Sequence, residues 1–296
     1  MDFKPADISM KDMVEKYTGR WKLECSEYTF SNLLMWGCGG NILLCEEDGA
    51  LYILLHWGNK RFMFAPLTLD IEVGAYQKAL DKAAEYLREN CIDVLFKGIS
   101  GPIKQMFEAC AGYELMDDRD NSDYVYTMES LRDLSGKKLH AKRNHINQFM
   151  AQYGKSFEYV KITPDMMDEC VAVYNEWLSE KSPDDTDSME LCAIKVLLKH
   201  MDTLGIRGGG IRIDGRLLAF TLGQKIDDNM AVVHIEKADN EIMGLYTVIN
   251  NQFVKNDLKD VRYINREEDM GLEGLRKAKL SYYPAYLIDK FEGRPV

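Results

Sequence analysis

Two short apolar runs separated by an aspartate and a glycine open the regular pattern of the first half of the chain. The runs occupy 41–45 and 51–55, and Asp48-Gly49 lies between them. Glycine adopts the positive φ of a tight hairpin turn at little steric cost, so this arrangement predicts a β-hairpin. A third apolar run at 61–64 predicts the next strand.

After these strands the apolar positions recur at intervals of three and four residues. The residues with this spacing are Tyr76, Ala79, Leu80, Ala83 and Leu87. Side chains spaced in this way lie on one face of an α-helix, so the pattern predicts an amphipathic helix with one buried face. A strand at 92–96 and a short helix after Gly101-Pro102 complete the series of elements.

The second half of the chain repeats this order. Apolar runs at 211–213 and 217–220 flank Asp214-Gly215, and a longer run follows at 231–236. The apolar face of the next expected helix consists of Ile242, Leu245, Tyr246, Ile249 and Phe253. The second half therefore predicts another hairpin, a central strand and a helix, in the same sequence as the first.

A strand at 261–264 and a helix at 272–279 end the second series, as their counterparts end the first. The two turn aspartates, Asp48 and Asp214, are separated along the chain by the same number of residues as the first apolar residues of the two helices. Five elements in the same order and spacing predict that one folding unit has been duplicated.

At 296 residues the chain is long for a single hydrophobic core and suits two domains of ordinary size. We expect domains at 1–134 and 135–296, the first diverged and non-catalytic and the second carrying the active site. The second domain should open with helices that start at Thr163-Pro164 and after Asp187. A linking helix is expected at 136–153, and its apolar stripe would be Leu139, Ile146, Phe149, Met150 and Tyr153.

The composition is that of a folded protein, with 46% hydrophobic and 29% charged residues. No run approaches the roughly 20 apolar residues that span a bilayer, so no membrane span is expected. The first residues lack the basic start and apolar run of a signal peptide, which predicts a cytoplasmic location. Oligomeric state is left open.

Metal-ligand spacing is not found among the cysteines and histidines. The seven cysteines are scattered without a Cys-x-x-Cys pair, and the five histidines have no ligand spacing. An acidic site built from Glu267, Glu268 and Asp269 is the remaining metal hypothesis. Consecutive residues on a short loop seldom converge on one ion, so no metal site is expected.

A local basic segment at 137–143 stands out from a chain whose net charge is −11. The acidic total disfavours wholesale wrapping by nucleic acid or an anionic membrane, but it leaves room for tRNA at this patch. Lys142 and Arg143 follow Leu139 by three and four residues, so they lie on the side of the apolar stripe. They either extend to solvent at its edge or hold the phosphates or carboxylate of a ligand between the copies, and the sequence leaves both readings open.

The two copies differ most after their late strands. The first continues with nearly apolar residues at 95–99, whereas the second continues Asn265-Arg266-Glu267-Glu268-Asp269. Ligands collect at the carboxyl ends of strands in open α/β sheets. A solvated loop with Arg266 paired to a neighbouring acid is the simpler interpretation, but the contrast between the copies favours a functional site.

The order of elements resembles the GNAT acyltransferase fold in tandem. The segments 136–149, 265–271 and 275–282 also resemble the signatures of an uncharacterised bacterial family, one grouped with the C-terminal domain of phosphatidylglycerol lysyltransferases. The resemblance covers essentially the whole chain. It implies an α/β (α+β) fold of two GNAT-like domains, each a mixed, mostly antiparallel sheet flanked by helices.

The wider group includes Fem-type peptidoglycan aminoacyltransferases, which take aminoacyl groups from tRNA. Its Gly-Leu-x-x-Phe-Lys-x-x-Phe segment is similar to 274–282, where Ala278 and Tyr282 stand at the aromatic positions. The resemblance implies that Lys279 stabilises charge on the donor ester. Lysyltransferases of the group also carry a membrane domain, for which this sequence has no counterpart, so a bilayer lipid is not the expected acceptor.

Acetyl-CoA-dependent GNATs follow the central strand with a glycine-rich, basic loop whose N–H groups hold a pyrophosphate. The corresponding stretch, 237–244, has acidic residues and a single glycine. We therefore expect an aminoacyl- or acyltransferase that uses aminoacyl-tRNA or an acyl-CoA as donor and an amine or hydroxyl of a small molecule or peptide as acceptor. An acetyl-CoA-dependent N-acetyltransferase and a non-catalytic ligand-binding module are the alternatives.

Transfer of this kind needs a positive group near the developing oxyanion and a proton acceptor. Lys279 and Arg266 are the candidate positive groups, and Glu267 or Glu236 would accept the proton. Candidate substrate-binding residues are Lys142, Arg143, Asn144, Asn265, Lys277 and Tyr282.

Overall fold

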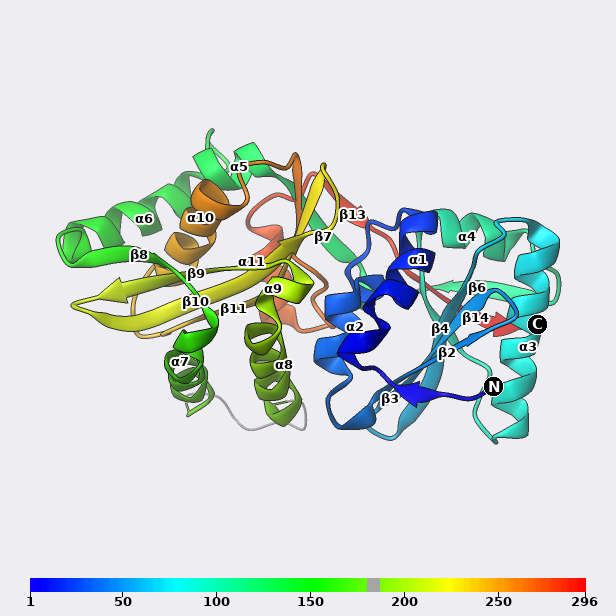
Figure 1. Cartoon of the computed structure of the whole chain (residues 1–296). Coiled ribbons are helices and arrows are strands. Elements are labelled where there is room, and N and C mark those ends of the chain that lie inside the picture. Colours follow the sequence, from blue (N-terminus) through cyan, green and yellow to red (C-terminus); the bar gives the residue numbers. More distant parts are fainter. Residues whose placement is uncertain (180–186) are drawn as a thin grey trace. The chain divides into compact units, whose positions relative to one another are not determined.

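The computed structural model describes residues 1–179 and 187–296, which form two compact units. Unit 1 consists of Met1–Asp123 together with Ile288–Val296, and unit 2 of Tyr124–Leu287 (Figure 1). Each unit is built on one sheet flanked by helices, as the duplication predicted.

The sheet of unit 1 has the strand order β1-β2-β3-β4-β5-β14-β6. Its strands are β1 (Lys4–Pro5), β2 (Ile42–Glu47), β3 (Ala50–Trp57), β4 (Lys60–Thr68), β5 (Phe96–Ile99), β6 (Tyr113–Asp117) and β14 (Phe291–Pro295). The pair β4 and β5 is parallel, and the other pairs are antiparallel. Asp48 and Gly49 join β2 to β3 with φ values of 51° and 74°, so the predicted hairpin is confirmed.

Helices of unit 1 pack on this sheet through apolar faces. They are α1 (Lys11–Trp21), α2 (Phe30–Trp36), α3 (Val73–Glu89) and α4 (Gly101–Glu108). All five residues of the predicted apolar face of α3 are buried. The short 3₁₀ turn η2 (Ser26–Tyr28) precedes α2.

The sheet of unit 2 has the order β13-β7-β12-β11-β10-β9-β8. Its strands are β7 (Asp123–Thr127), β8 (Phe157–Lys161), β9 (Ile206–Ile213), β10 (Arg216–Lys225), β11 (Met230–Ala238), β12 (Tyr263–Asn265) and β13 (Tyr286–Ile288). The β9–β10 hairpin turns at Asp214 and Gly215, with φ values of 51° and 84°. The pair β11 and β12 is parallel, in the place that β4 and β5 occupy in unit 1.

Helices cover both faces of the unit 2 sheet (Figure 1). They are α5 (Met128–Asp133), α6 (His140–Tyr153), α7 (Met167–Ser179), α8 (Asp187–Lys199), α9 (Met201–Leu204), α10 (Leu245–Asp257) and α11 (Glu273–Leu280). Helix α10 lies on one face with α5 and α6, and α7 packs on β10 and β11 from the other side, next to α8.

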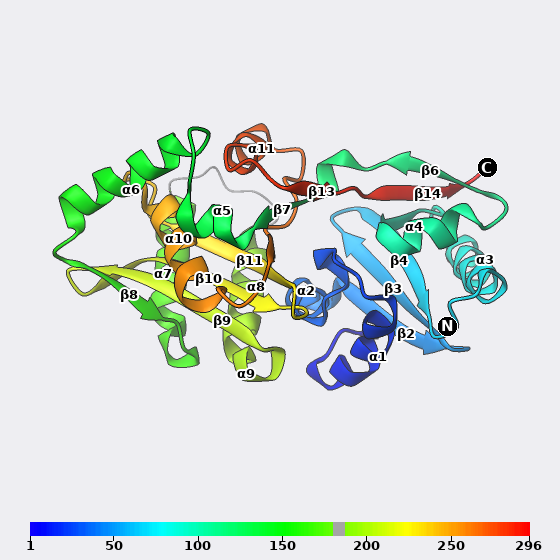
Figure 2. The same cartoon turned by 90° about the horizontal axis from the view of Figure 1, so that it is seen from above.

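The two halves of the chain exchange a strand. In unit 1 the C-terminal strand β14 lies between β5 and β6, and in unit 2 the strand β7 lies between β12 and β13. Figure 2 shows the red C-terminal strand beside the much earlier β6. The compact units are therefore divided at 123/124 and 287/288, whereas the sequence predicted one boundary at 134/135.

Two local predictions differ from the structure. The strand expected at 92–96 begins only at Phe96, because the Ile92 N–H still bonds to the Leu87 carbonyl in the last turn of α3. Helix α10 begins at Leu245 after Gly244, whose φ is 86°, whereas α3 begins at Val73. The equal spacing of the copies thus applies to the turns and not to the helix starts.

The linking helix was predicted at 136–153, which is too long, and one residue of its predicted apolar stripe is exposed. Helix α6 begins at His140, and its stripe residues Leu139 and Phe149 are buried. Met150 is 41% exposed. It follows Phe149 by one residue, a rotation of about 100° that turns its side chain away from α10.

Candidate active site

In unit 2 the parallel strands β11 and β12 separate partway along their length. They are paired from Met230 opposite Tyr263 to Val232 opposite Asn265, and β11 then continues to Ala238 without β12. A bulge in β11 accompanies the separation, because Ile235 pairs with Leu222 but Val233 pairs with the next residue of β10. We call the region beyond Val232 and Asn265 the unit 2 opening.

An ion pair bridges this opening. Nη2 of Arg266, which follows β12, lies 2.9 Å from Oε1 of Glu236 on β11, and each side chain is 12% exposed. Nδ2 of Asn250, on α10, donates to the other Glu236 oxygen at 3.1 Å. Burial would lower the pKa of Arg266, but the charge of Glu236 raises it, so the guanidinium stays protonated.

Two polar atoms at this ion pair are buried without a hydrogen-bond partner in the described part of the chain. They are Nη1 of Arg266, a donor, and Oδ1 of Asn250, an acceptor. A buried polar group without a partner costs about 1–3 kcal/mol. The pair around Glu236 thus offers one donor and one acceptor to a further group.

Lys142 approaches the same ion pair from α6. Its Nζ lies 3.9 Å from the centroid of the Tyr282 ring, and the Arg266 guanidinium lies 4.9 Å from the same centroid. Burial lowers the pKa of Lys142 to about 8, the charge of Arg266 adds to this effect and Glu236 opposes it. We call Lys142, Glu236, Asn250, Arg266 and Tyr282 the Arg266 cluster.

Lys279 fastens the loop after β12. Its ammonium group donates to the backbone carbonyls of Arg266, at 2.6 Å, and Glu268. The residue is 9% exposed, and its own carbonyl accepts the hydroxyl hydrogen of Tyr126 at 2.8 Å. The ammonium group thus binds the backbone of this loop, and the role on the donor ester that the resemblance implied for Lys279 stays a prediction.

Asp269 and Asn265 hold the two ends of the same loop. Both carboxylate oxygens of Asp269 accept hydrogen bonds from Arg276, at 2.7 and 2.8 Å, and the Tyr124 hydroxyl donates at 2.5 Å. Burial alone would raise the pKa of Asp269, but these bonds and one from the Gly271 N–H lower it to about 2. Oδ1 of Asn265, which is fully buried, accepts the N–H of Glu267 at 2.7 Å.

A second polar bridge crosses the unit 2 opening. Nδ1 of His234, the residue at the bulge of β11, lies 2.8 Å from Oε1 of Glu267. Glu267 was among the residues predicted from the sequence, but His234 was not. The signal available was a histidine inside the apolar run 231–236, because a polar residue in a buried strand needs a partner.

Three predicted residues lie outside these contacts. Arg143 donates through Nη1 to the carbonyls of Leu134 and, at 2.8 Å, of Gly136. Asn144 is exposed, with Nδ2 3.2 Å from His140 Nε2, and Lys277 is exposed on α11. Each step along a helix rotates the side chain by about 100°, so Arg143 and Asn144 do not share the direction of Lys142.

In unit 1 an aromatic side chain fills the corresponding opening. Strands β4 and β5 are paired only at Met63 and Phe64, and Gly98 follows with a φ of 68°. A Cβ on Gly98 would lie 3.0 Å from the ring of Tyr28, whose hydroxyl donates to the Ala65 carbonyl at 3.0 Å. Unit 1 therefore has a packed core where unit 2 has the Arg266 cluster.

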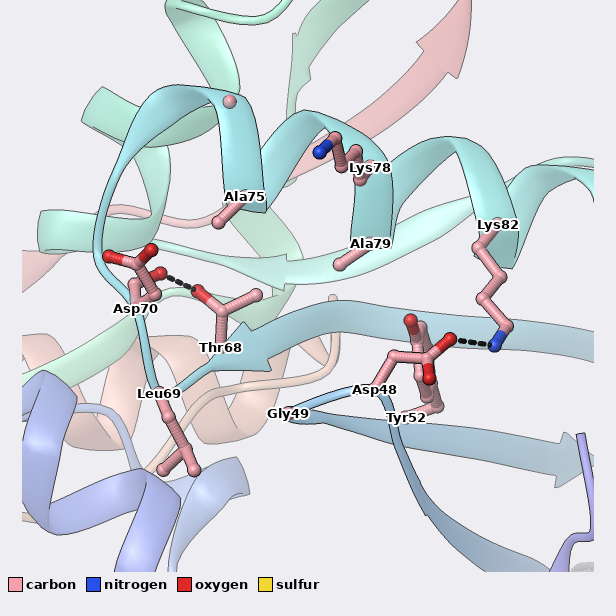
Figure 3. Close-up of a pocket in the computed structure, with 11 residues that line it drawn as sticks. Asp48, Gly49, Tyr52, Thr68, Leu69, Asp70, Ala75, Lys78, Ala79 and Lys82 are labelled. Atoms are coloured by element: carbon pink, nitrogen blue, oxygen red, sulfur yellow. Dashed lines mark hydrogen bonds and ion pairs between the residues drawn. The ribbon is translucent and has the colours of Figure 1, made fainter.

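Unit 1 has a cavity of its own, with a volume of about 550 Å³, between the β2–β3 turn and α3 (Figure 3). Its charged lining residues are Asp48, Asp70, Lys78 and Lys82, and Lys82 already pairs with Asp48 at 2.6 Å. None of the predicted site residues lines it. Within 1–179 and 187–296, no three His, Cys, Asp or Glu side chains are grouped as a metal ion would require.

No helix within the described ranges is both long enough and apolar enough to span a bilayer.

Comparisons with known proteins agree with this architecture. The family described as phosphatidylglycerol lysyltransferase, C-terminal, matches residues 20–292. A conserved protein of unknown function from Bacteroides thetaiotaomicron is 31% identical across all of both chains, with a TM-score of 0.87. L-PGS from Bacillus licheniformis is 13% identical with a TM-score of 0.66, covering 99% of this chain and 93% of that one.

A tandem GNAT protein from the clavulanic acid biosynthesis pathway has a TM-score of 0.57 and 13% identity, covering 99% of this chain and 98% of that one. The prediction of two tandem GNAT-like domains is confirmed by this likeness and by the two sheets.

Proposed function

Because the chain belongs to the family of phosphatidylglycerol lysyltransferase C-terminal domains, we propose that unit 2 transfers an aminoacyl group from an activated ester to an amine or hydroxyl acceptor. Aminoacyl-tRNA is the proposed donor, and a small molecule or peptide supplies the acceptor. The observation that carries the proposal is the Arg266–Glu236–Asn250 arrangement, with a donor and an acceptor both buried and unpaired in the described chain.

An aminoacyl ester has one hydrogen-bond acceptor and one donor that could pair with Nη1 of Arg266 and Oδ1 of Asn250. Its carbonyl oxygen accepts a hydrogen bond from Nη1 of Arg266, and its α-ammonium donates to Oδ1 of Asn250 beside the Glu236 carboxylate. A plain acetyl group has the carbonyl alone and would leave Asn250 unpaired. Sites with buried polar groups discriminate strongly against ligands that leave those groups without partners.

In the proposed reaction the acceptor attacks the ester carbonyl, a new bond forms to the carbonyl carbon, and the ester C–O bond breaks. Arg266 is the cation beside the oxygen on which negative charge develops. Lys142 would add a second positive charge on the donor side, because most of it is protonated at neutral pH with a pKa of about 8. Lys279 keeps Arg266 in place through the loop carbonyls.

Acetyl-CoA is less favoured as donor because N–H groups of the loop before α10 already form hydrogen bonds within the loop and are not available to a pyrophosphate. The Glu241 N–H bonds to the Asp239 side chain at 2.8 Å, and the Ile242 N–H bonds to the Asp239 carbonyl. A Cβ on Gly244 would lie 2.6 Å from the His145 carbonyl oxygen, so α6 packs closely against the start of α10. These contacts leave a poor cradle for a pyrophosphate.

The test compares labelled aminoacyl-tRNA with labelled acetyl-CoA as donor, in the presence of a mixture of amine acceptors. We expect transfer from aminoacyl-tRNA, reduced about 100-fold or more in Arg266→Gln. Arg262→Gln is the matched control, because Arg262 is exposed three residues before β12 ends. Transfer from acetyl-CoA alone would favour an N-acetyltransferase, and binding of either donor without turnover would favour a non-catalytic module.

A further inference from the structure

His234 is a buried histidine with a specific partner. Its side chain is fully enclosed, and its Nδ1 lies 2.8 Å from Oε1 of Glu267. It occupies the bulge of β11, two residues beyond Val232, where β11 and β12 stop pairing. The histidine thus lies at the base of the unit 2 opening, two residues before Glu236 on the same strand.

The contact with Glu267 fixes which nitrogen of His234 bears hydrogen. A carboxylate only accepts hydrogen bonds, so Nδ1 is the donor and the neutral ring has a lone pair on Nε2. Nε2 is buried and has no hydrogen-bond partner among the residues that the structure describes. A buried acceptor of this kind needs a hydrogen-bond donor from a ligand or from an enclosed water.

The backbone holds Glu267 in place for this contact. Glu267 has a φ of 58°, a left-handed conformation that costs a residue with a side chain roughly 1 kcal/mol or more. Its N–H bonds to the Asn265 side chain and its carbonyl accepts the Tyr124 N–H at 3.1 Å. Lys279 binds the carbonyls of the residues on either side, Arg266 and Glu268. Strain maintained by so many contacts is typical of a functional position.

The two carboxylates that the sequence analysis offered as proton acceptors are both engaged. Glu236 accepts hydrogen bonds from Arg266 and Asn250, one on each oxygen. Glu267 accepts from His234. Protonation of either carboxylate would disrupt a buried pair, whereas the lone pair of His234 Nε2 accepts a proton without breaking any bond that the structure contains.

We propose that His234 is the general base of unit 2, and that Glu267 is the residue that positions it. This inference rests on the proposed transfer reaction. Nε2 takes the proton of the attacking amine or hydroxyl as its nitrogen or oxygen bonds to the ester carbonyl carbon. The imidazolium then returns that proton to the leaving ester oxygen as the C–O bond breaks. Arg266 faces the carbonyl oxygen during the same step.

The first test needs no substrate. Long-range ¹H–¹⁵N NMR of the labelled full chain at pH 8 should show His234 with hydrogen on Nδ1 and none on Nε2. The His234→Gln spectrum identifies the signal among the five histidines. Hydrogen on Nε2 at this pH would overturn the assignment of the base, whatever the protein is found to transfer.

The second test measures transfer by His234→Gln and Glu267→Gln, with His200→Gln as the control histidine. We expect His234→Gln to lower kcat about 100-fold or more with KM little changed, and Glu267→Gln to lower kcat about tenfold. Melting curves identify any variant that fails to fold. If His234→Gln does not fold, the kcat of Glu267→Gln, which preserves the shape of the side chain, is the test of the proposal. Undiminished kcat in folded variants would refute the base while the transfer function stands. A wild-type chain that transfers from no donor would refute both.

Discussion

At the scale of single residues, the role that the sequence resemblance implies for Lys279 differs from the contacts that this lysine makes in the structure. The resemblance implies that it acts on the donor ester, but in the structure its ammonium group binds two backbone carbonyls of the loop that carries Arg266 and Glu267. In the proposed transfer reaction, Lys279 acts by holding this loop. Its loss should therefore alter both stability and activity.

Replacing Lys279 with methionine removes two charge-assisted hydrogen bonds and leaves buried carbonyls unpaired. We expect the free energy of unfolding of unit 2 to fall by about 3 kcal/mol, and its melting temperature by about 10 °C. Lys277→Met is the control, because Lys277 is exposed on the same helix. Scanning calorimetry of both variants measures the difference, and equal melting temperatures would contradict the positioning role.

Lys142 should react with acylating reagents at a lower pH than an ordinary lysine. Because its pKa is lowered to about 8 by burial and by Arg266, half of its amine is neutral, and hence nucleophilic, near pH 8. Mass spectrometry after brief labelling across a pH series gives the midpoint. Arg266→Gln should raise this midpoint and Glu236→Gln should lower it. A midpoint that neither variant moves would mean that Lys142 lies outside the Arg266 cluster.

Asp269 should make unit 2 sensitive to acid. Its pKa is about 2 in the folded chain, against roughly 3.9 when unfolded. A lowered pKa contributes stability that is fully present above about pH 4 and is lost as the pH falls through 2. The shift corresponds to about 3 kcal/mol. Asp269→Asn should lose this amount at pH 7 and only about a third of it at pH 2.5, as urea denaturation would measure. An equal loss at both values would contradict the assignment.

Part of the candidate site was predictable from the sequence, because some of its residues are polar where apolar residues would be expected. Arg266 and Glu267 stand where the first copy is apolar, and Glu236 ends a strand that should be buried. The positions of Lys142 and Arg143 were indistinguishable from spacing alone, since both follow Leu139 within a turn. Only the packing of α6 against α10 decides that Lys142 joins the cluster and that Arg143 binds carbonyls near 135.

At the scale of elements, the exchanged strands β7 and β14 were not predictable from the pattern. Both are short, and nothing in their sequences states which sheet they complete. The hairpins were predictable because the turn chemistry of Asp48-Gly49 and Asp214-Gly215 is local. Strand partners far apart along the chain depend on tertiary packing, so the expected boundary at 134/135 cuts β7 from the sheet that contains it.

The exchange makes a prediction about fragments. The fragment 124–287 contains unit 2 with nearly all its sheet, including β7, and should unfold cooperatively by circular dichroism. The fragment 135–296 lacks β7, which leaves an edge of the short β12 unpaired, and should be unfolded or aggregated. The fragment 1–123 lacks β14 and should fold only when a peptide of 288–296 is added. Equal stability of 124–287 and 135–296 would contradict the division.

The opening between parallel strands is the element-scale difference between the copies. In unit 1 Tyr28 fills it, and in unit 2 it contains two polar bridges. Duplication thus preserved the sheet and the helix order, while the occupant of one gap changed from an aromatic ring to charged side chains. This difference explains why only unit 2 is proposed to be catalytic.

At the scale of the whole molecule, the net charge of −11 requires any tRNA donor to be recognised locally. The basic segment at 137–143 has part of its charge committed to internal contacts, since Arg143 binds carbonyls and Lys142 packs on Tyr282. Recognition of the aminoacyl group itself therefore has to supply much of the selectivity. In the proposed function, Glu236, Asn250 and Arg266 are the residues that supply it.

The most direct measurement is calorimetric titration of the full chain with a hydrolysis-resistant aminoacyl-tRNA, in which an amide replaces the ester, and with the same molecule acetylated on its α-amine. We expect the free amine to bind at least about tenfold more tightly, because the acetylated nitrogen cannot be an ammonium beside Glu236 and Asn250. The preference should disappear in Glu236→Gln. Equal binding of the two molecules by the wild-type chain would contradict the proposal that unit 2 recognises an aminoacyl group.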